Sequence, residues 1–216
     1  MNKTSYGFGI TPARPDTTCD VINFYETQND TVIYRKIGKD MPELTFQILI
    51  INSNMYSPVK EIVIKDSESK KIIQTLTEDR DSIFVFNMEF NDYNFDGYLD
   101  FYLTDACAIL GNCYGQVYIF NPDKKIYVRD RAFDEMTSIQ TDKDKKEIYS
   151  LNRCCAGASS ISMTFKYSGG KLYKSKQVNM DYDGKSKFIY NILEYNFDGR
   201  VINKKTVESE EMGLEF

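Results

Sequence analysis

The sequence predicts an all-β protein, with antiparallel sheets that form a sandwich, a barrel or a small propeller-like array. Short runs of alternating or β-branched apolar residues recur along the chain, and polar turn segments such as "SESK", "NPDK" and "NFDG" separate them. No window keeps a helical period. The 16 Tyr and 14 Phe residues, with no Trp, also favour strands.

Twelve segments fit strands by this pattern. In chain order they are 44–52, 61–66, 71–76, 82–88, 98–103, 116–120, 125–130, 147–151, 162–167, 171–178, 187–195 and 200–207. The segment "RAFDEMTSI" is the nearest to a helical turn. We expect a loosely structured N-terminal extension over residues 1–40, which contain Pro12 and Pro15, and one β-rich domain over residues 41–216.

Composition excludes several function classes. The formal net charge is −5, and the lysines are scattered among the acids instead of forming a basic stripe, so nucleic acid is not an expected partner. The longest apolar run, "LTFQILII", is well short of the roughly 18 residues that cross a membrane. The chain has no His, which rules out imidazole triads and Cys/His metal sites.

We therefore expect no enzyme. A carboxylate pair of glycosidase type stays open as an alternative, because 32 acids offer many spatial pairs. Glu89, in "NMEFN", has the most apolar surroundings of these acids. We expect it to face solvent or to support a nearby ion.

The segment "DYNFDGYLD" (92–100) has the spacing of a calcium loop. Its expected ligands are the side chains at its first, third, fifth and ninth positions and the carbonyl at its seventh: Asp92, Asn94, Asp96, Tyr98 and Asp100. Gly97 permits the sharp turn, and a divalent cation would turn the repulsion among three carboxylates into cohesion. Leu103 stands where an EF-hand has its bidentate Glu. The alternative is a solvated Asx-rich turn.

The letters "YNFDG" recur at 195–199. In this second copy Glu194, Asn196 and Asp198 occupy the first, third and fifth positions, but Ile202 replaces the acid at the ninth. We interpret it as a hairpin turn of Asp-Gly type, with weak metal binding as the alternative. The "DYDG" at 181–184 is likewise expected to be a turn.

Five cysteines bear on the compartment. Cys107 and Cys113 bracket "CAILGNC", a loop that a disulfide closes easily. Cys154 and Cys155 are expected to form a strained vicinal bridge; alternatively they pair separately or stay reduced. Cys19 is left free. Oxidation of at least one pair indicates a periplasmic or extracellular protein, while the first residues show no apolar signal segment.

A family resemblance rests on four features in order: "VKEIVIKDSESKKIIQTL", "DYNFDGYLDF", "GQVYIFNPDKKIYV" and a Cys-Cys pair near "KYSGGKLY". Over roughly residues 44–180 the chain resembles bacterial periplasmic proteins related to the integrin-type FG-GAP calcium loop. One branch consists of lipoproteins that inhibit lysozyme-like enzymes and act as immunity proteins for peptidoglycan-degrading effectors of secretion systems. The anchor cysteine of such lipoproteins is not evident, because Cys19 lies too far in, so membrane contact is expected only through an anchor outside this chain.

The resemblance implies a β-rich fold, one Ca²⁺ ion at Asp92–Asp100 and a protein partner. The implied function is that of an immunity protein, an inhibitor that binds and blocks a secreted toxin of the lysozyme-like, peptidoglycan-degrading class. The alternative is a calcium-stabilised extracellular adhesion or scaffold module, because adhesins and propellers use the same loop.

Two regions are candidates for partner binding. The loops at 104–115 and 152–160 interrupt the strand rhythm with small residues and cysteines, and the alternative is a disulfide-stapled connection without a partner. The segment "YSGGKLY" resembles the Ser-Gly loop that inhibitors of lysozyme-like enzymes place in a target cleft, and the alternative is a Gly-Gly hairpin turn. The candidate residues are Gly111, Asn112, Tyr114, Ala158, Ser168 and Tyr173.

Overall fold

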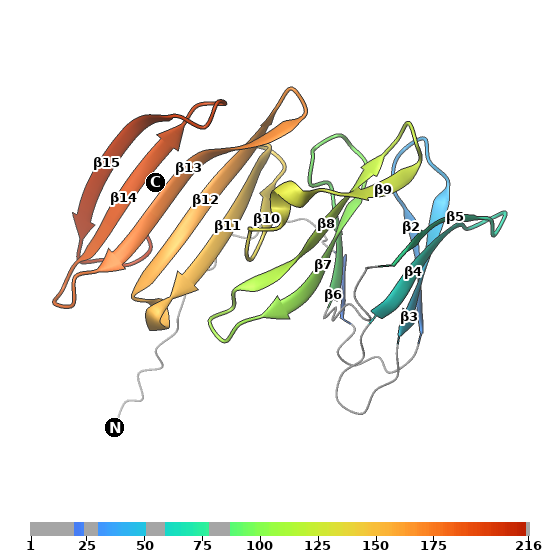
Figure 1. Cartoon of the computed structure of the whole chain (residues 1–216), viewed down its shortest axis with the longest axis horizontal. Coiled ribbons are helices and arrows are strands. Elements are labelled where there is room, and N and C mark those ends of the chain that lie inside the picture. The colour runs from blue at the N-terminus through green and yellow to red at the C-terminus, as the bar shows by residue number, and fades with distance from the viewer. Residues whose placement is uncertain (1–19, 24–29, 51–58, 78–86, 215–216) are drawn as a thin grey trace.

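The structure is a computed structural model that describes residues 20–23, 30–50, 59–77 and 87–214. In these residues the chain forms fifteen β-strands and two 3-10 helical turns, and every strand pair is antiparallel (Figure 1). The predicted all-β class with antiparallel sheets is confirmed. No helix among the described residues has the length and apolarity needed to cross a membrane.

The strands form three sheets. The four-stranded sheet has the order β2 (Thr31–Lys36), β3 (Glu43–Ile50), β4 (Val59–Asp66) and β5 (Ile72–Leu76). The five-stranded sheet has the order β1 (Asp20–Asn23), β6 (Asn87–Asn91), β7 (Asp100–Cys107), β8 (Cys113–Asn121) and β9 (Ile126–Arg129). The six-stranded sheet has the order β10 (Gln140–Asp142), β11 (Glu147–Cys154), β12 (Ser159–Ser168), β13 (Lys171–Tyr182), β14 (Phe188–Tyr195) and β15 (Val201–Ser209). The 3-10 turns are η1 (Arg131–Phe133) and η2 (Cys155–Gly157).

The five-stranded sheet is the middle layer, because alternate residues of its strands enter two different cores. On β7, Phe101 and Leu103 pack with Phe46 and other residues of the four-stranded sheet. Tyr102, between them, packs instead with Ile148 of the six-stranded sheet. The strands of the middle sheet are therefore covered on both faces, and the three sheets follow one another across the molecule (Figure 1).

Most of the predicted strands correspond to observed ones, with ends shifted by a few residues. The predicted strand at 82–88 lies largely outside the described residues, and β6 begins at Asn87. Three strands were not predicted, β1, β2 and β10, of which two lie within the proposed loose extension 1–40. The β-rich structure therefore begins before residue 41, since "TVIYRK" of β2 has the β-branched and aromatic composition of a strand and pairs with β3.

Candidate functional site

The acidic loop at 92–99 connects β6 to β7 and is fixed by contacts on both sides. Tyr93 is fully buried, and its ring packs edge-on against Tyr102 and Phe133. Near the other end of the loop, the main-chain N–H of Leu99 donates to the carbonyl of Ile37 at 2.7 Å. The loop is therefore held between the two core clusters, and its shape does not depend on its polar residues alone.

Inside the loop, backbone amides converge on the acidic side chains. Asp92 accepts the N–H of Asp96 at 3.0 Å with one carboxylate oxygen and the N–H of Gly97 at 2.9 Å with the other. Asn94 Oδ1 also accepts from the N–H of Asp96, at 3.1 Å, and Asp96 Oδ1 accepts from the N–H of Tyr98, at 2.9 Å. Gly97 has a φ of +91°, which a residue with a side chain rarely adopts. The first, third and fifth positions of the predicted calcium loop are thus folded around one another.

Asp100 is the most constrained acid of the loop. Its side chain is fully buried and accepts three main-chain N–H groups, from Tyr93 at 2.8 Å, Asn94 at 3.3 Å and Phe120 at 2.8 Å. Burial raises the pKa of Asp100 to about 8; the amides of Phe120 and Tyr93 oppose this shift, and the charges of Asp96 and Asp92 add to it. A bound cation would reverse the unfavourable electrostatics that raise this pKa.

Asp92 shows the same effect in weaker form, since burial raises the pKa of its carboxyl and the nearby charge of Asp96 adds to the shift. Tyr98 places its ring against Phe120, with centroids 5.6 Å apart, which leaves its main-chain carbonyl as the predicted ligand.

The residues of this loop fit a calcium ion in chemical kind. Carboxylate and amide oxygens are hard donors, and a carboxylate oxygen that accepts one N–H keeps a lone pair for a cation. The hydroxyl of Tyr167 is buried without a hydrogen-bond partner, and burial together with the charges of Asp130, Asp100, Asp96 and Asp92 raises its pKa. An unsatisfied buried oxygen near these carboxylates is what an ion with its bound water would relieve.

The described residues contain no group of three or more His, Cys, Asp and Glu side chains arranged for a metal ion. Two of the five predicted ligands are groups of another kind, the Asn94 side chain and the main-chain carbonyl of Tyr98. Calcium binding by Asp92, Asn94, Asp96, Tyr98 and Asp100 therefore stays a prediction.

The second "YNFDG" copy forms the predicted hairpin turn, between β14 and β15. Asn196 closes it: its N–H donates to the carbonyl of Arg200 at 3.0 Å, and its Oδ1 accepts the N–H of Arg200 at 2.9 Å. Glu194 is turned away from the loop amides and accepts from Asn203 Nδ2 at 3.1 Å.

The two long loops predicted to face a partner lie side by side. A disulfide joins Cys107 to Cys113, as predicted, and is compatible with a periplasmic or extracellular location. Asn112 links this loop to the end of β11, because its Nδ2 donates to the carbonyl of Arg153 at 2.7 Å and its Oδ1 accepts the N–H of Arg153 at 2.8 Å. Asn112 is only 6% exposed, so its expected contact with a partner is corrected to a supporting role.

The same end of the molecule exposes apolar side chains. Ile109 at the tip of the disulfide loop is fully exposed, and Tyr114 is 40% exposed. Gly111 is exposed with a φ of +80°, and Ser138 Oγ donates to its carbonyl at 2.8 Å. Ala158, after η2, is half-buried. We call residues 108–111 and 154–158 the tied-loop end.

Cys154 and Cys155 are exposed free thiols in the structure, with Sγ atoms 2.6 Å apart. The vicinal bridge expected from the sequence is not formed. Neighbouring Cα atoms are about 3.8 Å apart, which is below the usual range for a disulfide. Cys19, expected to be free, lies outside the described residues.

The "SGG" candidate is a hairpin turn, as in the alternative interpretation. Ser168 pairs with Lys171, and Gly169 and Gly170 have φ values of +56° and +75°. Tyr173 packs its ring edge-on against Phe197 of the second "YNFDG" copy, with centroids 5.4 Å apart.

This hairpin does not join the tied-loop end. The strand β12 runs from Ser159 to Ser168, and at the usual rise per residue its ends lie about 30 Å apart. The candidate residues therefore divide into two groups: Gly111, Tyr114 and Ala158 at one end, and Ser168 and Tyr173 at the other. The sequence does not show this separation, because it depends on strand direction within the sheet.

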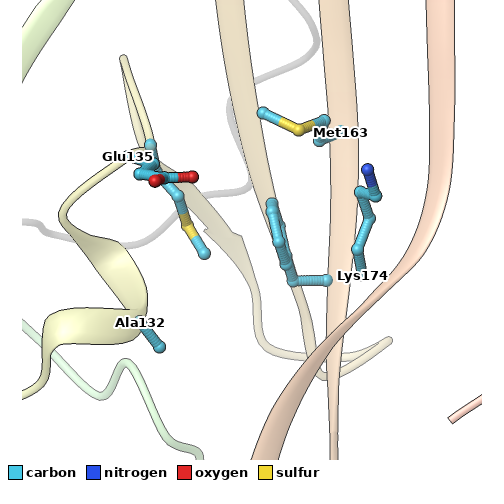
Figure 2. Close-up of a pocket in the computed structure, with 6 residues that line it drawn as sticks. Ala132, Glu135, Met163 and Lys174 are labelled. Atoms are coloured by element: carbon cyan, nitrogen blue, oxygen red, sulfur yellow. The ribbon is translucent and has the colours of Figure 1, made fainter. Parts of the chain in front are cut away.

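A shallow hollow of about 190 Å³ lies between the η1 region and the six-stranded sheet (Figure 2). Glu135 and Lys174 stand on opposite sides of it, with Met163 between. Lys174 is already engaged, since its Nζ donates to Gln177 at 2.5 Å and lies 4.5 Å from the ring centre of Tyr195.

Comparisons with known proteins support the fold. No protein-family profile and no curated protein sequence gives a significant match. The chain is similar to a solved structure described as "Structure of a Xanthomonas Type IV Secretion System related protein", with a TM-score of 0.59 and 12% identity, over 88% of this chain and 99% of that one. At this identity the likeness shows a shared fold alone.

Proposed function

We propose that this protein is an immunity protein that binds and blocks a secreted antibacterial toxin of the peptidoglycan-degrading, lysozyme-like class. The observation that carries the proposal is the tied-loop end, where a disulfide and Asn112 fix two loops side by side and Ile109 stands fully exposed. The shared fold with a secretion-system related protein from Xanthomonas supports an association with secretion.

Rigidity makes this end suited to inhibition. A loop that is ordered before binding loses little conformational entropy when it fills a cleft, so more of its contact energy appears as affinity. The Cys107–Cys113 bridge closes the loop, and the two hydrogen bonds between Asn112 and Arg153 fix it to β11. Ile109 then serves as an exposed apolar side chain whose burial in a pocket of the toxin favours binding.

Net charge adds a reason for the expected target class. The chain carries a formal charge of −5, which attracts a basic enzyme and raises the rate of encounter. This contribution should weaken as salt increases. The protein itself performs no catalysis in this proposal, and a Ca²⁺ ion held by Asp92, Asn94, Asp96, Tyr98 and Asp100 stabilises the scaffold.

The test is protection of cells in the periplasm. Cells that export both this protein and a wall-degrading toxin encoded beside its gene should survive, whereas cytoplasmic expression of this protein should not protect them. Ile109→Asp and Ala158→Arg should abolish protection and binding in pull-downs without lowering the melting temperature. Ile72→Asp is the matched control, because Ile72 is a 57% exposed isoleucine on β5.

Equal protection from the cytoplasm, or full activity of Ile109→Asp, would reject the proposal. If Ser168→Asp or Tyr173→Ala abolished protection instead, the hairpin end would be the inhibitory surface. If the original protein bound no toxin in pull-downs, the calcium-stabilised adhesion module would become the favoured function.

A further inference from the structure

Strand β15 is an unusual sheet edge in this molecule. It has nine residues, and its sequence "VINKKTVES" contains neither Pro nor Gly. It pairs with β14 on one side, and no described strand pairs with its other side. The other outer strands, β1, β2, β5, β9 and β10, have three to six residues. A long, regular outer strand offers its free N–H and carbonyl groups to another strand.

The outer side of β15 is open to solvent among the described residues. Its first six residues are all exposed, and Val201 and Ile202 are 51% and 65% exposed. The segment that follows binds to β14 instead: the hydroxyl of Tyr190 donates to the carbonyl of Glu211 at 3.0 Å and accepts the N–H of Gly213 at 2.9 Å. The chain after β15 therefore does not occupy the outer edge at these contacts.

The charges of β15 are arranged so that the strand is complementary to itself. Two lysines, Lys204 and Lys205, precede Glu208 in the strand. When two identical strands pair antiparallel in one continuous sheet, a two-fold axis perpendicular to the sheet relates them. The residue at this axis lies opposite its own copy, and any two residues that lie opposite each other have numbers that are both odd or both even. With the axis at Thr206, Lys204 of each copy lies opposite Glu208 of the other. With the axis at Lys205, that lysine would oppose its own copy.

We propose that β15 pairs antiparallel with β15 of a second copy, around Thr206, and joins two six-stranded sheets into one. Opposite charges directly across two strands stabilise the pair, whereas like charges destabilise it. Lysines on an outer strand also oppose pairing with strands that lack matching acids. Glu208 already accepts from Lys187 Nζ of its own chain at 2.8 Å, and both groups are exposed, so its carboxylate remains accessible to a second lysine.

Sedimentation and light scattering of the purified chain test the pairing. We expect a monomer–dimer equilibrium that depends on protein concentration, with Lys204→Glu and Glu208→Lys each weakening dimerisation by about tenfold or more. The double variant Lys204→Glu/Glu208→Lys exchanges the two charges and should return the dissociation constant to within about threefold of the original. Lys185→Glu, an equal charge change at an exposed lysine outside β15, should leave it unchanged.

Melting curves recorded at a concentration where every variant is monomeric should agree, because the altered residues are exposed. A chain that stays monomeric up to about 1 mM, the upper limit of weak association, overturns the inference. A dimer whose dissociation constant is unchanged by Lys204→Glu and by Glu208→Lys also overturns the inference, because the contact would then lie on another surface. Toxin binding does not enter this test, so its result stands apart from the proposed function.

Discussion

The two "YNFDG" segments use the same five letters for different structures. In the first, Tyr93 is fully buried in the core between the middle and six-stranded sheets, and the loop links β6 to β7 of the middle sheet. In the second, Phe197 is 47% exposed and the segment is a simple hairpin turn at the margin of the six-stranded sheet. Both glycines have positive φ, +91° at Gly97 and +77° at Gly199.

Both copies share the left-handed glycine, but Phe95 has a φ of +60° whereas its counterpart Phe197 has no positive φ, so the flanking residues affect the backbone of the turn as well as its chemistry. Asp92 gathers the amides of Asp96 and Gly97, but Glu194 in the matching position bonds to Asn203. Asp100 is buried and accepts three amides, whereas Ile202, its counterpart, is 65% exposed. An ion site therefore requires Asp92 and Asp100, which lie outside the shared "YNFDG" letters.

The largest expected difference between the copies lies at their ninth positions. Asp100→Ala removes the acceptor of three main-chain amides in a buried site and should lower the free energy of unfolding by about 3–5 kcal/mol. Ile202→Ala should change it by less than about 0.5 kcal/mol. Urea unfolding measures both, and similar losses would show that Asp100 is not the support that its hydrogen bonds indicate.

Calcium should distinguish the copies next. At about a hundredfold excess over the dissociation constant, Ca²⁺ should stabilise the protein by about 2.7 kcal/mol, and a chelator should remove this gain. Asp96→Ala should abolish the response, whereas Asp198→Ala at the same position of the second copy should keep it. Thermal melts with and without calcium give the comparison, and isothermal titration gives the stoichiometry. An unchanged melt of the original protein, or a response that needs Asp198, would contradict the assignment.

The sequence predicted the local part of this contrast correctly. Alternating apolar runs located most strands, and Ile202 in place of an acid distinguished the second copy as a hairpin turn. The contacts made by Asp100 with Phe120, twenty residues away, were not predictable, because they depend on how β7 and β8 pair. For the same reason Asn112 was expected to meet a partner, although it meets Arg153.

Composition and residue pattern also misjudged two features, the strand β2 and the length of β12. The strand β2 was assigned to a loose extension because nearby prolines dominate that part of the chain, yet Ile33 is buried against the four-stranded core. The distance between Ala158 and Ser168 followed from the length of β12, which was predicted shorter than it is. Long-range pairing thus decides which candidate residues meet.

Replacing the aromatic residue of each copy by Ala should give a smaller difference in the free energy of unfolding than the substitutions at the ninth positions. Phe95 is half-buried and packs edge-on against Tyr167 across two sheets, with centroids 6.3 Å apart. Phe95→Ala should cost about 2 kcal/mol, and Phe197→Ala, which removes a more exposed ring from Tyr173, about 1 kcal/mol or less. Equal losses in urea unfolding would mean that Phe95 does not connect the acidic loop to the six-stranded sheet.

The smallest difference is expected at the shared glycines. Both adopt the left-handed backbone region, and a Cβ added at Gly97 or Gly199 would meet no atom within 4 Å. The cost of Gly→Ala therefore comes from the backbone conformation alone, about 1 kcal/mol at each site, and the two losses should agree within about 0.5 kcal/mol. Gly→Asn is the matched control, since Asn tolerates this region better and should recover part of the loss at both positions. These measurements belong in chelator, where no ion adds to the first loop. If Gly97→Ala then cost several times more than Gly199→Ala, the two left-handed glycines would themselves differ in backbone strain, in addition to the difference in backbone conformation between Phe95 and Phe197.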